Sequence, residues 1–327
     1  CFGLLGPNGA GKTTTLGVLT GEVRPPTRGE VTIFGHDLST GPGLQQAYQA
    51  LGVCPQVDPL WQPLSAKDHL MFFGRIKGVR EADLCRRVDA LLRRLGLDQA
   101  DATKPASTYS GGMKRKLSMG IALIGHSPLM FLDEPSAAVD AGAKRHLWKV
   151  IKMRGLDQTV VLTTHSMEEA EALCDRIAIQ VKGQLRCLGP PNHIRQKYGS
   201  GYQLEMFCEP HEAPAPGLSF SQVRPSQNVI DFVHSRLSVE ATLLEFHGDR
   251  YLFQLPPMGG GGGTLNLGRL FTEMLLNSES VGVSEYSVTR PSLEQVFLRF
   301  AREQEESEED AHVAEPGAGT AANPSGR

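Results

Sequence analysis

Near its start the chain carries a glycine-rich run, Gly6 to Thr13, that reads GPNGAGKT and matches the pattern GxxxxGK[ST]. The run follows the apolar segment Phe2–Leu5 and leads into a helical pattern, the setting in which backbone amides and a helix N-terminus surround phosphate groups. We expect Lys12 to reach the terminal phosphates of a nucleotide and the hydroxyl of Thr13 to bind Mg²⁺. Taken alone, the run predicts only a nucleotide-binding site.

Two carboxylates end a second apolar segment. Asp133 and Glu134 directly follow Leu129–Leu132. In a parallel sheet such a strand brings its terminal acids to the edge where a phosphate loop also lies. We expect Asp133 to hold the Mg²⁺ shell and Glu134 to polarise an attacking water as general base.

The run from Ser110 to Lys114, SGGMK, places small residues at a predicted helix start. Exposed amides and the positive end of the helix dipole suit a phosphate. In isolation an ordinary N-cap at Ser110 is the better interpretation. Its position ahead of the Asp133–Glu134 strand favours the phosphate role.

Gln56 and His165 each follow a predicted strand. The Gln56 side chain can approach metal and water, and His165 is a donor suited to a γ-phosphate. Either residue alone is more often an ordinary polar group of the surface or the core. The functional interpretation of both therefore depends on the other motifs. Residues 136–140 follow Glu134 and predict a turn before the next helix.

Short apolar runs alternate with helical patterns over residues 1–198, which predicts an α/β domain with a sheet covered by helices. The expected strands are Phe2–Leu5, Val31–Phe34, Leu51–Cys54, Leu129–Leu132, Val160–Thr163, Ile177–Val181 and Gln184–Leu188. The expected helices are Ala66–Ile76, Glu81–Leu95, Gly111–Ile124, Ala141–Met153 and Pro191–Tyr198.

Residues 199–302 read β-α-β-β-α-β followed by a helix, the order of a small ferredoxin-like α+β domain. The elements are Tyr202–Cys208, Gln227–Leu237, Ala241–Phe246, Tyr251–Leu255, Leu265–Leu276, Val281–Val288 and Leu293–Arg302. The five glycines 259–263 read as a connector. From residue 303 to 327 the acidic, Ala/Gly/Pro-rich sequence predicts a disordered acidic tail.

Composition bounds the chain as a whole. Its 327 residues are 40% apolar and 21% charged with net charge -3, which excludes disordered and collagen-like classes and disfavours a nucleic-acid binder. No run approaches the ~20 apolar residues of a membrane helix. Its 6 cysteines form no CxxC pair and predict reduced thiols. Because the chain begins with Cys1 in the middle of an apolar strand pattern, we expect a fragment of a longer protein.

These motifs stand in the order and spacing of an ATP-binding cassette (ABC) domain, a P-loop NTPase fold with a helical subdomain, over residues 1–198. The chain further resembles the A-subfamily of lipid-exporting ABC transporters, with residues 199–302 as its C-terminal regulatory domain. The segments that carry this likeness are GVCPQVDPLWQPLSAKDHL, TYSGGMKRKLSMGIALIG, TTHSMEEAEALCDRIAI and SVTRPSLEQVFLRFAREQ.

The resemblance implies an ATPase that uses ATP and Mg²⁺. The catalytic residues so implied are Glu134, His165, Lys12 and Gln56, and the Mg²⁺ ligands are Thr13, Gln56 and Asp133. The residues implied to contact nucleotide are Gly6, Pro7, Asn8, Gly9, Ala10, Gly11, Lys12, Thr13, Thr14, Ser110, Gly111, Gly112 and Asp140.

The resemblance also implies partners. A second cassette would pack head to tail, so that Ser110, Gly111 and Gly112 clasp the γ-phosphate of the ATP held by that partner. Transmembrane domains would dock on the segment after Gln56, which puts the cassette on the cytoplasmic side of a membrane. No nucleic-acid partner is expected, because the only dense basic cluster, Lys114 to Lys116, lies on a helix that fits the family pattern.

The chain departs from the family pattern in a few places. Met113 stands where Gln or Asn is common, Tyr109 where Leu is, and Ala138-Val139 where Gly-Leu is. The aromatic residue that stacks on adenine in this family would precede Cys1. Three alternatives stay open: a subunit of a drug or polysaccharide exporter, a soluble ABC ATPase that is not a transporter, and a weakly hydrolysing nucleotide switch.

Overall fold

The computed structural model describes residues 1–300 except 138, 200, 209–224 and 257–265. The described residues divide into two compact units, Cys1–Pro191 together with Arg299 and Phe300, and Asn192–Leu298. The division falls after Pro191, the first residue of helix α9 (Pro191–Tyr198), whereas the sequence predicts it after Tyr198. The domain limits, including the acidic tail outside the described residues, stay a prediction.

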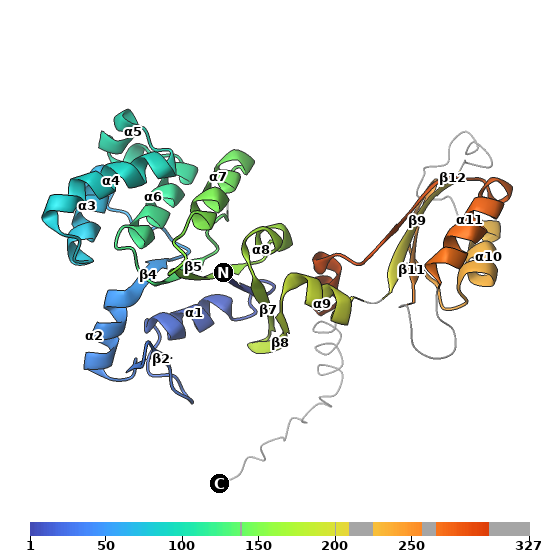
Figure 1. Ribbon diagram of the computed structural model, residues 1–327, viewed down its shortest axis with the longest axis horizontal. Coiled ribbons are helices and arrows are strands. Elements are labelled where there is room, and N and C mark those ends of the chain that lie inside the picture. Colours follow the sequence, from blue (N-terminus) through green and yellow to red (C-terminus); the bar gives the residue numbers. More distant parts are fainter. Residues whose placement is uncertain (138, 200, 209–224, 257–265, 301–327) are drawn as a thin grey trace, which may run out of the picture. The chain divides into compact units, whose positions relative to one another are not determined.

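A six-stranded sheet in the order β4-β5-β6-β1-β7-β8 forms the centre of the first unit (Figure 1). Its strands are β1 (Phe2–Leu5), β4 (Leu51–Cys54), β5 (Leu129–Asp133), β6 (Thr159–Thr164), β7 (Arg176–Val181) and β8 (Gln184–Gly189). Pairing is parallel from β4 through β7 and antiparallel for the hairpin β7–β8. The predicted P-loop-type α/β fold is therefore confirmed. The carboxyl ends of the parallel strands β4, β5, β6 and β1 lie at one edge of the sheet.

Helices pack around this sheet: α1 (Lys12–Thr20), α2 (Gly41–Ala50), α7 (Ala141–Lys152) and α8 (Met167–Leu173). The expected strand Val31–Phe34 is shorter, since only β2 (Thr32–Ile33) pairs with β3 (His36–Asp37). The sequence analysis did not predict α2 and α8. Both are short and start with side-chain caps, Thr40 and Ser166, whose oxygens accept amide hydrogens of the first turn.

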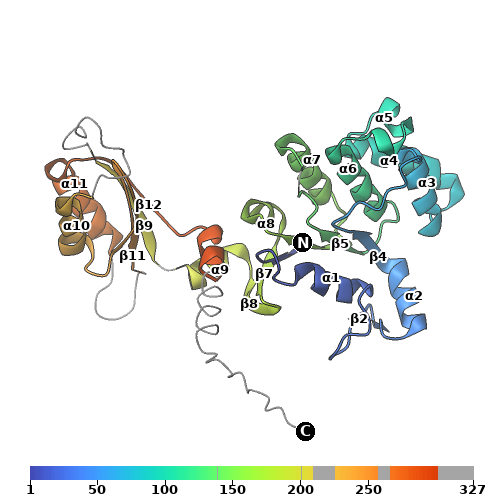
Figure 2. The same cartoon turned by 180° about the vertical axis from the view of Figure 1, so that it is seen from behind.

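A helical subdomain is formed by α3 (Ala66–Ile76), α4 (Glu81–Leu95), α5 (Gln99–Thr103), η1 (Ala106–Thr108) and α6 (Gly111–Leu123). Both ribbon views show these helices gathered together beside α7 (Figures 1 and 2). A capping box between Ser65 and Asp68 starts α3, and Leu70, Leu84 and Leu95 are fully buried between the helices. The subdomain holds α6, and with it residues 110–112, in a fixed place.

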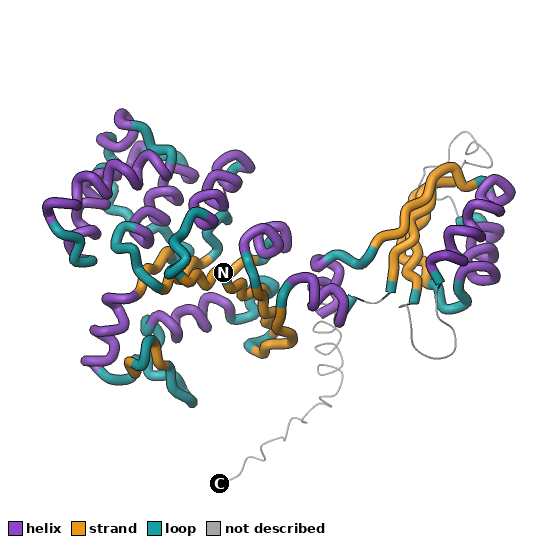
Figure 3. Tube along the Cα trace, viewed as in Figure 1, coloured by secondary structure: helices purple, strands orange, loops and turns teal. Residues whose placement is uncertain are grey.

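The second unit contains β9 (Tyr202–Cys208), α10 (Gln227–Phe232), a π-helical turn η3 (Val233–Leu237), β10 (Thr242–His247), β11 (Arg250–Leu255), α11 (Leu267–Val281) and β12 (Val283–Thr289). Its antiparallel sheet has the order β10-β11-β9-β12, with the first strand between the third and fourth, as a β-α-β-β-α-β unit requires. Helices α10 and α11 lie together on one face of this sheet (Figure 3).

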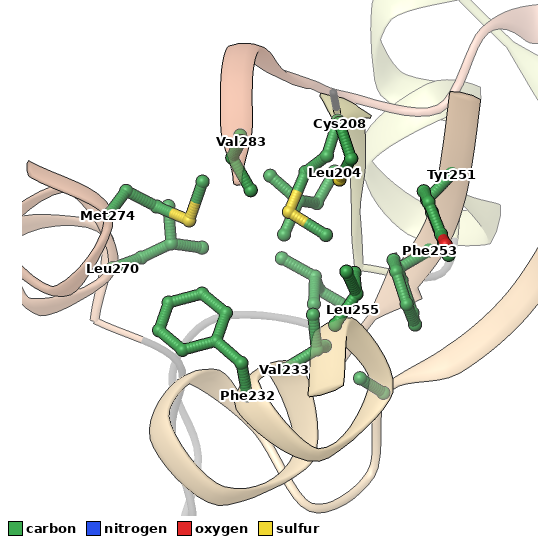
Figure 4. Close-up of a cluster of buried hydrophobic side chains, with 13 residues drawn as sticks. Leu204, Cys208, Phe232, Val233, Tyr251, Phe253, Leu255, Leu270, Met274 and Val283 are labelled. Atoms are coloured by element: carbon green, nitrogen blue, oxygen red, sulfur yellow. The ribbon is translucent and has the colours of Figure 1, made fainter. Parts of the chain in front are cut away.

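The core of the second unit lies between those helices and the sheet. Phe232 and Val233 come from the α10–η3 segment, Leu270 and Met274 come from α11, and Phe253 comes from β11 (Figure 4). Helix α11 runs to Val281, beyond the expected end at Leu276, because its left-handed cap is Gly282. Residues 293–300 are helical, and the start of that helix is capped by Ser292 and Gln295.

The helices and the cysteines can be compared with the predictions made from composition. Over the described parts of the chain, the structure contains no helix that is both long and apolar enough to span a bilayer. All 6 cysteines carry free thiols.

Candidate active site

The site lies where four strands of the first sheet end. The glycine loop follows β1, Gln56 follows β4, Asp133 and Glu134 end β5, and His165 follows β6. Because β1 pairs with β6, and β5 lies between β4 and β6, these ends are neighbours although the motifs are far apart in the sequence. Parallel strands put their carboxyl ends at a common edge, so the sheet itself gathers the predicted residues.

The glycine loop packs against strand β7 and the turn that follows this strand. A Cβ on Gly6 would lie 2.4 Å from the carbonyl oxygen of Gln180, so only glycine fits there. Further along, the amide of Gly183 donates to the carbonyl of Ala10 at 2.9 Å. Gly9 and Gly11 take left-handed φ angles of 79° and 94°, which lets the loop curl. The loop is therefore already shaped to wrap a phosphate group.

Lys12 lies inside this loop and is only 6% exposed. Its ammonium group donates to the carbonyls of Gly6 at 2.9 Å and Pro7 at 3.1 Å. Asn8, Gly9, Thr13 and Thr14 are exposed around it. A buried ammonium group held by loop carbonyls, with exposed loop and helix-start residues beside it, is the arrangement expected of a site for an anionic ligand.

Glu134, at the end of β5, lies close to Lys12 of the glycine loop and to His165 after β6. Its Oε1 atom lies 3.7 Å from Nζ of Lys12 and 3.4 Å from Nδ1 of His165. The Glu134 side chain is 11% exposed, whereas that of His165 is 54% exposed. A nearly buried carboxylate thus lies between one buried ammonium group and one exposed imidazole.

Asp133 is almost fully buried, and its Oδ1 atom accepts a hydrogen bond from the hydroxyl of Thr163 at 2.5 Å. The same hydroxyl oxygen accepts from the amide of Glu134 at 3.0 Å. Thr13 and Gln56, the other expected Mg²⁺ ligands, are exposed nearby on the ends of adjacent elements. A hydroxyl, an amide oxygen and a carboxylate form the all-oxygen donor set that Mg²⁺ prefers, so these residues fit that ion.

Residues 110–112 lie at the start of α6 rather than in the glycine loop. The hydroxyl oxygen of Ser110 accepts from the amide of Met113 at 3.3 Å, so the N-cap interpretation holds as well. The nearest neighbours of Gly112 are in α7 and the preceding loop, at Ala143 and Asp140. Asp140 caps α7, where its Oδ1 accepts from the amides of Gly142 and Ala143. The nucleotide roles of these residues stay predictions.

Sequence reasoning missed three buried polar residues at the site, Thr163, Arg115 and Glu169. Arg115 was counted within the dense basic cluster from Lys114 to Lys116, and its side chain is only 4% exposed. Glu169 is 1% exposed, and its Oε1 atom accepts from the hydroxyl of Ser136 at 2.7 Å and from the indole of Trp148 at 3.0 Å. The available signal for Glu169 was its place three residues after Ser166, the S-x-x-E pattern of a helix start, in which the Ser166 hydroxyl accepts from the Glu169 amide at 3.3 Å.

Cys54 ends β4 beside this network and contacts the hydroxyl of Ser118 at 3.4 Å. Burial raises the pKa of the Cys54 thiol, and the nearby charge of Arg115 opposes that rise without cancelling it. The thiol therefore stays protonated at neutral pH and belongs to the packing of the strand rather than to the chemistry.

Residues 1–137 match a family model described as "ABC transporter". This part of the chain is an ATP-binding domain of the ABC transporter family. Such a domain implies that the chain binds ATP. The predicted resemblance to the A-subfamily is also confirmed, by the relatives that follow.

The chain is 40% identical over 98% of its length to the human phospholipid-transporting ATPase ABCA7. It is 41% identical over 95% of its length to the human phospholipid-transporting ATPase ABCA3. The chain spans only 14% and 17% of those two proteins.

Among solved structures, the ATP-binding subunit of an ABC transporter is 29% identical and superposes with a TM-score of 0.55 over 60% of this chain and 81% of that one. A dimeric ATP-binding cassette bound to ADP and Pi is 23% identical, with a TM-score of 0.53 over 58% and 84% of the two chains. This second likeness bears on the fold alone.

Proposed function

We propose that this chain is an ATP-hydrolysing cassette whose closure with a second cassette drives phospholipid transport across a membrane. The observation that carries the proposal is the position of Glu134, whose carboxylate lies 3.7 Å from Lys12 and 3.4 Å from His165 at the end of β5. Hydrolysis of ATP needs a base for the attacking water and positive charge for the phosphate oxygens, and these three side chains supply both.

In the proposed reaction, a water attacks the γ-phosphorus in line with the bond to ADP and gives its proton to the Glu134 carboxylate. Lys12 and His165 stabilise the negative charge on the γ-phosphate oxygens as that bond breaks. The loop amides hold the phosphates in place, and Gln56 orients the water. Thr13, Gln56 and Asp133 would hold Mg²⁺, which when bound neutralises charge on the phosphate oxygens.

The proposed second cassette packs against residues 110–112. Ser110 and Gly111 are exposed at the N-terminal end of α6, so a hydroxyl, free amides and the positive helix dipole face outward. Two similar solved structures are dimeric cassettes, although at 23% identity these bear only on the fold. ATP bound between two cassettes would supply the contacts that favour the closed pair over the open one.

The membrane partner is proposed to dock beyond Gln56. Val57, Trp61 and Phe72 are 80%, 44% and 43% exposed there, an unusual concentration of apolar side chains on a surface. Trp61 is held rigidly, with its ring stacked on Phe73 at 5.5 Å between centroids. Transmembrane domains at this surface would place the cassette on the cytoplasmic side, and the second unit would serve as the regulatory domain.

The test uses the full-length protein reconstituted into vesicles with a fluorescent phospholipid. We expect Mg²⁺ and ATP to cause labelled lipid to cross the bilayer with the wild type, and the Glu134→Gln variant to abolish both transport and phosphate release. A wild type that releases phosphate without moving any phospholipid would contradict the transport role. Equal phosphate release by wild type and variant would contradict the role of Glu134.

A further inference from the structure

Arg115 on α6 makes three hydrogen bonds to consecutive carbonyls at the end of the catalytic strand. Its Nη2 atom donates to the carbonyl oxygens of Asp133 at 2.5 Å and Glu134 at 2.9 Å, and its Nε donates to that of Pro135 at 3.0 Å. The side chain is only 4% exposed. One buried guanidinium group therefore fixes the main chain on both sides of the proposed general base.

The remaining nitrogen of Arg115 binds the segment that follows β4. Nη1 donates to the carbonyl oxygens of Pro55 at 2.6 Å and Gln56 at 3.3 Å, and it forms an ion pair with Asp58 at 3.0 Å. This segment leads directly into the exposed apolar surface at Val57 and Trp61. A single side chain thus connects that surface to the end of β5.

The main chain at Glu134 needs such support. Glu134 has a φ of 45°, a left-handed conformation that is unfavourable for a residue with a side chain. Such a conformation persists only where the surroundings hold it. At Glu134 the amide is held by the carbonyl and hydroxyl of Thr163, and the carbonyl is held by Arg115.

We propose that Arg115 is a positioning residue that keeps Glu134 in its strained conformation, with its carboxylate beside Lys12 and His165, and couples that conformation to residues 55–58. The inference rests on the ATP hydrolysis proposed above. Only arginine suits the position, because its planar group donates in several fixed directions at once. The single ammonium group of lysine cannot reach the carbonyls at 55–56 and at 133–135 together.

Arg115 transmits a displacement of residues 55–58 to Glu134. A displacement of residues 55–58, such as a membrane partner would produce at the adjoining surface, pulls on the same guanidinium group that holds the Glu134 carbonyl. The Glu134 carboxylate then moves relative to the γ-phosphate, and small displacements of a catalytic group change rates strongly. The glycine loop, Gly6 to Thr13, makes none of the contacts to Arg115 given above, so the share of the affinity for ATP that this loop supplies is expected to stay unchanged.

The experiment measures kcat and KM for ATP in the reconstituted full-length protein with wild type, Arg115→Lys, Arg115→Met and Lys116→Met. Lys116→Met is the matched control, since it removes a charge from the next position on α6. Retention of radiolabelled ATP on ice and the thermal unfolding temperature are measured on each variant. We expect kcat to fall about 10-fold for Arg115→Lys and about 100-fold for Arg115→Met, with KM and ATP retention within about twofold of wild type. Lys116→Met should match wild type.

The Arg115→Lys variant keeps a buried cation beside Asp58 and should therefore fold. It still tests the proposal if Arg115→Met does not fold. A fall in kcat that is accompanied by equal losses of ATP retention and thermal stability would overturn the proposal, because it would reduce Arg115 to a structural residue. An Arg115→Lys protein with the wild-type kcat would overturn it too. A wild type without ATP turnover would instead overturn the proposed function on which the inference rests.

Discussion

The hydroxyl group of Thr163 on β6 donates a hydrogen bond to the carboxylate of Asp133 on the neighbouring strand β5. Thr163 is fully buried, and its oxygen also accepts from the amide of Glu134 at 3.0 Å. One side chain therefore sets the position of two adjacent acidic residues that have different proposed tasks. A buried carboxylate without such a donor is unfavourable, so this contact stabilises the strand end as well as the site.

Replacing Thr163 by valine should destabilise the protein and slow hydrolysis. The shapes are matched, but the valine leaves the Asp133 carboxylate and the Glu134 amide each with one partner fewer. We expect a loss of about 1–3 kcal/mol in the free energy of unfolding, measured by urea titration, and a reduced kcat for ATP. Thr163→Ser retains the hydroxyl and should keep most of both quantities. A valine variant as stable and active as wild type would rule out this role.

Glu169 should matter more to stability than its exposed neighbour Glu168. Glu169→Ala leaves the buried hydroxyl of Ser136 and the indole of Trp148 without their common acceptor, which is expected to cost about 2–4 kcal/mol. Glu168 is 71% exposed and pairs with Lys144, so Glu168→Ala is expected to change stability by no more than about 0.5 kcal/mol. Urea unfolding followed by tryptophan fluorescence compares the two, and equal effects would contradict the packing described.

Alanine at Gly6 should weaken ATP binding. The added Cβ would lie 2.4 Å from the carbonyl oxygen of Gln180 and 2.9 Å from Cβ of Ala10, so the loop would have to move away from β7. We expect affinity for ATP to fall at least about 10-fold, measured with a fluorescent analogue. Gly41→Ala, at the open start of α2 where a Cβ meets nothing within 4 Å, is the control. Unchanged affinity in Gly6→Ala would mean that the loop is less tightly fixed than described.

Exposed and buried cysteines should differ in their reactivity toward an alkylating reagent. Burial raises the pKa of Cys174 from 9.0 to about 12 and that of Cys208 from 9.0 to about 11, whereas Cys85 is exposed. Iodoacetamide at pH 8.5 should therefore label Cys85 and leave Cys174 and Cys208 unmodified, as read by mass spectrometry. In urea all three should react. Rapid labelling of Cys174 in the folded protein would contradict its burial.

The same shift predicts how stability depends on pH. The unfolded Cys174 thiol ionises near pH 9 while the folded thiol stays protonated until about pH 12. Its contribution to the free energy of unfolding is therefore complete below pH 9 and is lost as the pH rises toward 12. A Cys174→Ala variant should show a smaller loss of stability than wild type between pH 8 and pH 10.

The sequence predicted those parts of the site that depend on local pattern. Lys12, Glu134 and His165 each follow a strand in a recognisable motif, and a parallel sheet necessarily brings such positions to one edge. Long amphipathic helices such as α3 and α4 were predicted with the bounds that the structure gives them. Short capped helices such as α2 were missed, since a ten-residue segment with few apolar positions carries little periodic signal.

The residues that escaped prediction act through partners distant in sequence. Arg115 looks like a surface cation between two lysines, and nothing local indicates that carbonyls from β4 and β5 surround it. Thr163 looks like an ordinary β-branched strand residue until Asp133 is placed beside it. Such contacts follow from strand order and helix packing, which single-residue patterns do not encode.

The most direct test of the central claim, that Glu134 is the base for ATP hydrolysis, is to ask which nucleotide stays bound. The full-length protein and its Glu134→Gln variant are incubated with Mg²⁺ and labelled ATP, separated from free nucleotide by rapid gel filtration, and their bound nucleotide is identified. We expect the variant to retain intact ATP and the wild type to yield ADP and phosphate. Conversion of bound ATP to ADP by Glu134→Gln at the wild-type rate would contradict it.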